Sequence, residues 1–226
     1  MPSLVTHIYN IRDLVNGGRA NRAMTYGDRQ IAQWIRYWRA YLVGANIKKY
    51  NYVPQGYEQD LGCLTLTKAD KSMCQKYCWG EKVYYVEIPA VLDLPDNMAI
   101  TYFGLVNKQT RIPLSDYNYG SFAEYSRFSP AQRIYAEKIG NTLYVHGVDD
   151  LWALEGVNLR GVFADPANLV TDNGTEILCY DWDTDNYPIP ATLESAMYDL
   201  IFEKEVGIAR TVKADNSDNE VTNVTL

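Results

Sequence analysis

The chain has 226 residues, of which 47% are hydrophobic and 22% are charged, so its composition fits a globular protein and excludes disordered and collagen-like chains. Its formal net charge of −7 argues against a protein that binds nucleic acid by neutralising phosphates. Tyrosine is abundant, with 19 Tyr against 5 Phe and 5 Trp. Because tyrosine has an apolar ring and a polar hydroxyl, this content suits either a Tyr-rich β-domain or surfaces that become covered on assembly.

The first residues of the chain lack the features of a secretory signal peptide, and no apolar run approaches the length of a membrane span. We therefore expect a protein that folds in a cytoplasm, with no membrane partner. A reducing compartment would keep its cysteines as thiols. There are four of them: Cys63, Cys74, Cys78 and Cys179.

Two helices are predicted near the N-terminus. Residues 8–15 form a candidate short helix that Gly17 and Gly18 would end. Residues 28–45 predict a longer one, with Asp28 as its N-cap. Its apolar residues recur at intervals of three and four, as on one face of a helix: Ile31, Trp34, Ile35, Trp38, Tyr41 and Leu42.

The middle of the chain alternates short β-prone runs with turn residues, a pattern typical of a sheet with many connections. Gly140-Asn141 between two of these runs predicts a tight hairpin, because both residues tolerate positive φ. Asp165-Pro166 should end the last run. The predicted strands are residues 63–66, 82–88, 99–105, 133–139, 143–148 and 154–163, and residues 116–127 are predicted as a loop or short helix.

A last helix is predicted over residues 191–212, with Thr192 as its cap. Residues 213–226 carry one basic and three acidic residues and no aromatic residue, so they have too little apolar surface to fold alone. They are either an arm that docks on a partner or a frayed terminus. The candidate docking residues are Val221, Val224 and Leu226.

These elements define an α+β fold, with an N-terminal helical pair, a central antiparallel β-rich body, a long C-terminal helix and an extended C-terminal arm. We expect one domain over residues 1–212, with helices at about 8–45 and 191–212 and the β body at about 60–170, followed by the arm at 213–226. No internal repeat interrupts this layout.

Few residues offer chemistry. The only histidines are His7, near an N-terminus that we expect to be mobile, and His146, which alternates along a strand and is interpreted as structural. The cysteine spacing lacks the paired ligands of a zinc site. Asp181, Asp183 and Asp185 resemble the start of a calcium loop, but Asn186 replaces its glycine, which favours a solvated acidic loop. The sequence predicts no catalytic residue, cofactor or metal.

The segment from residue 143 to 169, LYVHGVDDLWALEGVNLRGVFADPANL, builds strands and ends at the phrase Gly161-Val162-Phe163-Ala164-Asp165-Pro166. Together with the helix-first, helix-last layout, this segment resembles the head-to-tail adaptor, or ring, proteins below the portal of short-tailed, crAss-like bacteriophages. The resemblance implies a structural virion protein that is not an enzyme. It would form a dodecameric ring that joins head to tail and continues the DNA channel.

The resemblance also implies partners: further copies of the chain, the portal protein, other tail or ring proteins, and genomic DNA that passes without sequence-specific binding. The arm at 213–226 would grip the portal. The candidate residues for contacts within the ring are Arg36, Arg39, Tyr198 and Glu205. Three alternatives remain open: a carbohydrate- or receptor-binding β-rich module of a phage tail, an enzyme that uses His146 with an aspartate, and another virion ring or stopper further from the portal.

Overall fold

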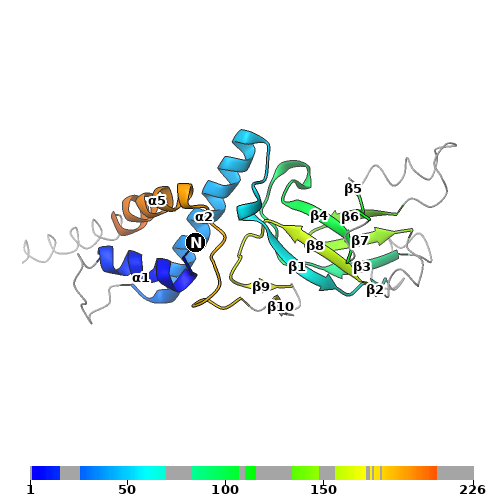
Figure 1. Ribbon diagram of the computed structural model, residues 1–226, viewed down its shortest axis with the longest axis horizontal. Helices are drawn as coiled ribbons and strands as arrows, with labels where there is room; N and C mark the ends of the chain where they lie inside the picture. The colour runs from blue at the N-terminus through cyan, green and yellow to red at the C-terminus, as the bar shows by residue number, and fades with distance from the viewer. Residues whose placement is uncertain are drawn as a thin grey trace, which may run out of the picture. The chain divides into compact units, whose positions relative to one another are not determined.

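The computed structural model describes residues 2–15, 26–69, 83–106, 110–115, 134–147, 156–171, 174, 176–178 and 180–207. The chain divides into two compact units (Figure 1). Met1–Tyr52 and Asp181–Leu226 form one, which we call the helical unit, and Val53–Tyr180 form the other, which we call the β unit.

The helical unit is built around one long helix, α2 (Asp28–Tyr50), which contacts α1 (Leu4–Val15), α5 (Ala191–Leu200) and the π-helix η3 (Ile201–Val206). The buried residues of α2 recur every four positions, so they form one stripe along the helix. They are Ile31, Ile35, Arg39, Val43 and Ile47.

Both N-terminal helices were predicted, but their ends differ from the prediction. Helix α1 begins at Leu4 rather than at residue 8, and α2 continues to Tyr50, where Asn51 takes the left-handed conformation with φ 52° and donates its N–H to the carbonyl of Ile47. The predicted N-cap Asp28 is wrong, because Gly27 occupies the cap of α2.

The C-terminal helix changes its hydrogen-bonding pattern after α5, where η3 follows as a π-helix, an irregularity that the periodicity of the sequence does not signal. Pro190 occupies the cap of α5, so the predicted cap Thr192 is also wrong. Residues 208–212 of the predicted helix, and the arm at 213–226, lie outside the described residues.

The β unit contains three sheets, with strand orders β1-β8-β4, β2-β3-β7-β6-β5 and β10-β9. The strands are β1 (Gln59–Leu64), β2 (Thr67–Lys68), β3 (Val83–Glu87), β4 (Ile100–Leu105), β5 (Leu114–Ser115), β6 (Tyr135–Ile139), β7 (Thr142–His146), β8 (Val157–Gly161), β9 (Leu169–Val170) and β10 (Glu176–Leu178). The single-turn 3-10 helix η1 (Gln55–Tyr57) precedes β1, and a second one, η2 (Pro95–Asn97), lies between β3 and β4.

The strand pairing agrees with the predicted antiparallel body. Every pair in the two larger sheets is antiparallel except β5 with β6, which is parallel. The predicted hairpin joins β6 to β7, and Gly140 at its turn has φ 59°. After β8, Phe163 forms an isolated bridge with Val91, and the chain turns at Pro166, as the sequence predicts.

Buried side chains from both larger sheets form one apolar cluster, which includes Tyr84, Phe103, Leu143, Leu159 and Phe163. The last three are 0% exposed. The strands therefore stabilise a closed core, and with the helical unit they make the chain an α+β protein, as predicted.

Candidate assembly surfaces

An aromatic stripe runs along the exposed side of α2. Two positions along an α-helix rotate a side chain by about 200°, so the residues two places after the buried stripe point away from it. We call five exposed residues on this outer side of α2 the tyrosine stripe. They are Gln33, Tyr37, Tyr41, Ala45 and Lys48. Tyr37 and Tyr41 are 60% and 58% exposed, which is high for large aromatic side chains.

The ring of Trp38 packs against both tyrosines of this stripe. Its ring meets those of Tyr37 and Tyr41 edge to face, at centroid distances of 5.1 and 5.7 Å. Its Nε1–H donates to Glu205 Oε1 at 3.2 Å, which fixes the indole against η3. Because the rings are held in place, a partner that covers them loses little side-chain entropy.

Charges of opposite sign lie on different helices of this unit. Helix α2 has five basic residues and one acidic residue: Arg29, Arg36, Arg39, Lys48, Lys49 and Asp28. Helices α5 and η3 have four acidic residues and one basic residue: Glu194, Asp199, Glu203, Glu205 and Lys204. The unit is therefore basic along its long helix and acidic along α5 and η3.

Arg39 is the charged residue that lies inside the unit. Its side chain is 0% exposed, its Nε–H donates to the carbonyl of Pro188 at 2.9 Å, and its guanidinium lies 5.8 Å from the ring centroid of Tyr187. A buried charge needs such partners to compensate for lost hydration. Arg39 thereby ties α2 to the segment that precedes α5.

His7 makes a second polar tie in the helical unit. The prediction of a mobile N-terminus around His7 is wrong, because His7 is 0% exposed within α1. Its Nδ1 lies 2.6 Å from the hydroxyl of Tyr198, which donates to Glu194 Oε1 at 3.3 Å. Burial lowers the pKa of His7, partly offset by the Glu194 carboxylate, and burial also raises the pKa of Tyr198.

The acidic loop, residues 181–185, is ordered by its own carboxylates. Asp181 accepts hydrogen bonds from the N–H of Asp183 and the hydroxyl of Thr184, and these bonds lower the pKa of Asp181. The N–H of Val5 donates to the carbonyl of Trp182 at 3.1 Å, which anchors the loop to α1. Trp182 is still 41% exposed. Among the residues that the structure describes, no cluster of side chains could hold a metal ion.

The polar residues of the β unit brace strands. His146 lies on β7, where its ring stacks on Tyr135 at 4.7 Å and its Nε2 is 3.9 Å from Glu137 Oε2. Burial lowers the pKa of His146 and raises that of Glu137. Across the other sheet, Asn158 donates to Asp60 Oδ1 at 2.6 Å beside the bulge in β1. No pattern in the sequence indicates this last contact.

The predicted site residues fall into four groups. Arg36 is exposed on α2, whereas Arg39 is buried in its own chain. Tyr198 and Glu205 are half-buried and accept or donate hydrogen bonds within the helical unit. The predicted docking residues of the arm lie outside the described residues: Val221, Val224 and Leu226. The tyrosine stripe was missed, because the sequence analysis placed Tyr41 on the apolar face of the helix, whereas its side chain is 58% exposed.

A protein-family model described as phage tail ring protein 2, from the crAss ring group, matches residues 6–224. The chain belongs to this phage tail ring family. The predicted resemblance to a ring protein of crAss-like phages is therefore confirmed, and a member of this family is a structural component of the virion. Among curated proteins nothing matches the chain.

Because a ring of identical subunits needs contacts between copies, the exposed surfaces of this chain are candidates for those contacts.

The free thiol of Cys63 is exposed on the β unit, and the other cysteines lie outside the described residues. No helix within the described ranges is both long and apolar enough to cross a membrane.

Proposed function

We propose that this tail ring protein forms a dodecameric ring directly under the phage portal, where it joins head to tail and continues the DNA channel. The observation that carries the proposal is the match to the tail ring family over residues 6–224. The net charge of −7 supports a channel wall that lets DNA pass without gripping it. The protein has no catalytic role in this proposal.

Within this proposal, residues 1–212 form the body of the subunit and residues 213–226 form the arm that grips the portal. Val221, Val224 and Leu226 fill small apolar pockets of the portal, because they are the apolar residues of an otherwise polar segment. Arg36 belongs to a contact between ring neighbours, since it is exposed on α2. Further tail or ring proteins, made like this one in the host cytoplasm, stack on the opposite side.

A ring turns one modest contact into many identical ones, so each interface is weak by itself while the closed ring resists dissociation. We therefore expect the free subunit to be monomeric at low concentration and the portal to template the ring.

The alternative, a carbohydrate- or receptor-binding module, needs aromatic side chains on the β body. In the described ranges, the strongly exposed tyrosines lie on the helical unit instead.

The test is native mass spectrometry of the full chain, alone and mixed with portal rings of the same phage. The expected result is a portal-dependent complex with one subunit per portal subunit, and loss of that complex in a variant with Val221, Val224 and Leu226 all changed to Ser. A matched control changes polar arm residues, Asn216 and Asn223, to Ser. Binding to sugars without binding to portal would contradict the proposal and favour the receptor module.

A further inference from the structure

The helical unit presents two surfaces of opposite charge on different sides of α2. The tyrosine stripe points away from the buried stripe, which contains Arg39. Arg39 in turn contacts Tyr187 and Pro188, which directly follow the acidic loop and Asn186. The acidic loop is therefore joined to the side of α2 that lies opposite the tyrosine stripe.

We propose that these two surfaces are the two halves of one head-to-tail contact, in which the acidic loop of one copy covers the tyrosine stripe of the next. This inference rests on the ring role proposed above. A ring interface is heterologous, so it joins two different patches of the same subunit, and the patches must be complementary and must face in different directions. Both conditions are met within the helical unit.

The charges match. The stripe includes Lys48 and is flanked on the exposed side of α2 by Arg29 and Arg36. The loop has three exposed carboxylates within five residues: Asp181, Asp183 and Asp185. Opposite charges on facing patches align the two copies and disfavour the reversed pairing, in which like charges would meet.

The aromatic content matches as well. Trp182 is 41% exposed at the centre of the loop, although a tryptophan in a stable fold is normally well covered. Tyrosine, tryptophan and arginine are the residues that dominate binding energy in protein interfaces. Trp182 from the loop, with Tyr37 and Tyr41 from the stripe, would form the apolar centre of the contact, and the charges would form its rim.

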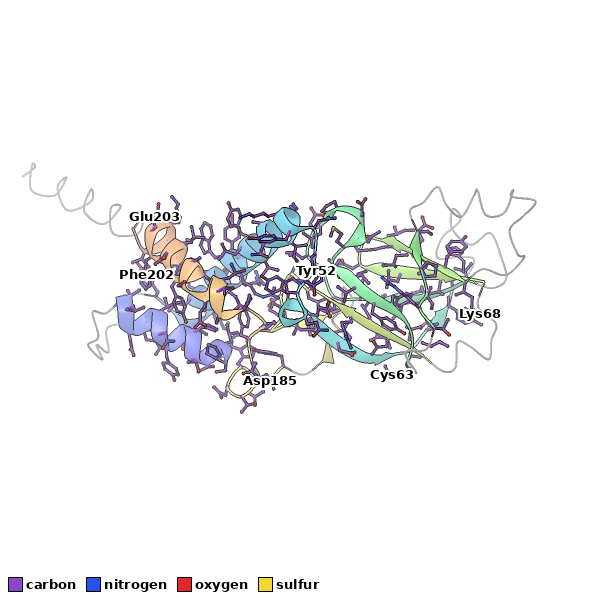
Figure 2. The ribbon with its side chains drawn as sticks, turned by 45° about the horizontal axis from the view of Figure 1, so that its top comes forward. Tyr52, Cys63, Lys68, Asp185, Phe202 and Glu203 are labelled. Atoms are coloured by element: carbon purple, nitrogen blue, oxygen red, sulfur yellow. The ribbon has the colours of Figure 1, made fainter. Side chains whose placement is uncertain are left out.

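The acidic residues of α5 and η3 are weaker candidates for this contact because, in the described residues, no large apolar side chain on these helices is exposed as Trp182 is. Most of their carboxylates, like two of those in the loop, have partners in their own chain. Glu205 accepts from Trp38, Glu203 pairs with Lys204 at 2.7 Å, and Glu194 accepts from Tyr198. Figure 2 shows Asp185 and Glu203 at separate edges of the helical unit, so a cross-link can tell the two surfaces apart.

The mixing experiment uses two variants of the full chain. The stripe variant carries Tyr37→Ser and Tyr41→Ser, and the loop variant carries Trp182→Ala and Asp183→Arg. Each retains one intact half of the contact. By mass photometry and sedimentation velocity at rising concentration, we expect each variant alone to self-associate about tenfold or more weakly than the wild type. An equal mixture should form heterodimers and nothing larger.

Two controls carry matched changes elsewhere. Tyr9→Ser removes a tyrosine that is 53% exposed on α1, and Asp93→Arg changes the charge of the β unit by the same amount as Asp183→Arg. Both controls should assemble as the wild type does. Wild-type assembly by the stripe or loop variant, or failure of their mixture to form heterodimers, would overturn the proposal.

A photo-cross-linking side chain at position 41 tests the contact directly, with isotope-labelled copies to distinguish links between chains from links within one. In the chain alone at high concentration, and in its mixture with portal rings, the expected product joins position 41 of one copy to residues 180–187 of another. A link to Asp199, to Glu203 or to the β unit, or no link between copies, would overturn the proposal. If the expected link forms but the portal is not bound, this inference stands and the portal-proximal role fails.

Discussion

The two units of this ring protein are stabilised in different ways. The β unit closes one apolar cluster between its larger sheets, and of its described residues only Val106 is a large hydrophobic side chain exposed by more than a third, at 38%. The helical unit also buries an apolar stripe on α2, but it adds buried polar contacts at His7 and Arg39 and leaves aromatic side chains exposed. We therefore propose that the β unit supplies rigidity, while the helical unit supplies the surfaces for assembly.

The largest expected effect tests the apolar core. Phe163→Ala removes a side chain that is 0% exposed in the cluster of the β unit, and the resulting cavity should cost about 3–5 kcal/mol of the free energy of unfolding. Urea unfolding followed by circular dichroism measures the loss, and hydrogen exchange read by mass spectrometry locates it. Faster exchange confined to the helical unit would contradict the assignment of Phe163 to the β core.

A smaller loss is expected from the buried arginine. Arg39→Ala removes the hydrogen bond to the Pro188 carbonyl and the contact with Tyr187, and should lower the free energy of unfolding by about 3 kcal/mol. Arg36→Ala, less than one turn away but exposed, is the matched control and should change it by less than about 0.5 kcal/mol. Equal losses in the same urea titrations would show that burial does not distinguish the two arginines.

The sequence predicted much of the fold because periodicity reports burial directly. Repeats of three and four located α2, and alternation with Gly140-Asn141 located the β6–β7 hairpin. Caps were missed because Gly27 and Pro190 stand there without a side-chain hydrogen bond. Arg39 was grouped with Arg36 as a surface residue, since only the tertiary contact with Pro188 shows that it is buried.

The candidate surfaces were harder to predict than the fold. Tyr37 and Tyr41 occupy positions that a helix can either bury or expose, and which of the two happens depends on where α1 and α5 pack. The polar chain from His7 through Tyr198 to Glu194 joins residues 191 positions apart, which no local pattern reports. The acidic loop was read correctly as solvent-exposed, but its anchoring at Val5 and its exposed Trp182 required the structure.

The smallest expected effect is the pH dependence of the helical unit. Because burial lowers the pKa of His7, the unfolded chain binds a proton more readily than the folded one, so the free energy of unfolding should fall as the pH drops below the ordinary value of 6.5. His7→Gln should flatten this slope, measured by urea unfolding at several pH values. His146→Gln tests the same effect in the β unit, where burial also lowers a histidine pKa.

Hydrogen exchange at each pH separates the two contributions. We expect wild-type exchange in α1 and α5 to rise at acidic pH, and His7→Gln to remove that rise while leaving the exchange of β6 and β7 unchanged. His146→Gln should do the reverse, because His146 packs on Tyr135 of β6. An identical response of both units to either substitution would mean that the two units lose structure together. The difference between the buried polar contacts of the helical unit and the apolar core of the β unit would then not determine stability.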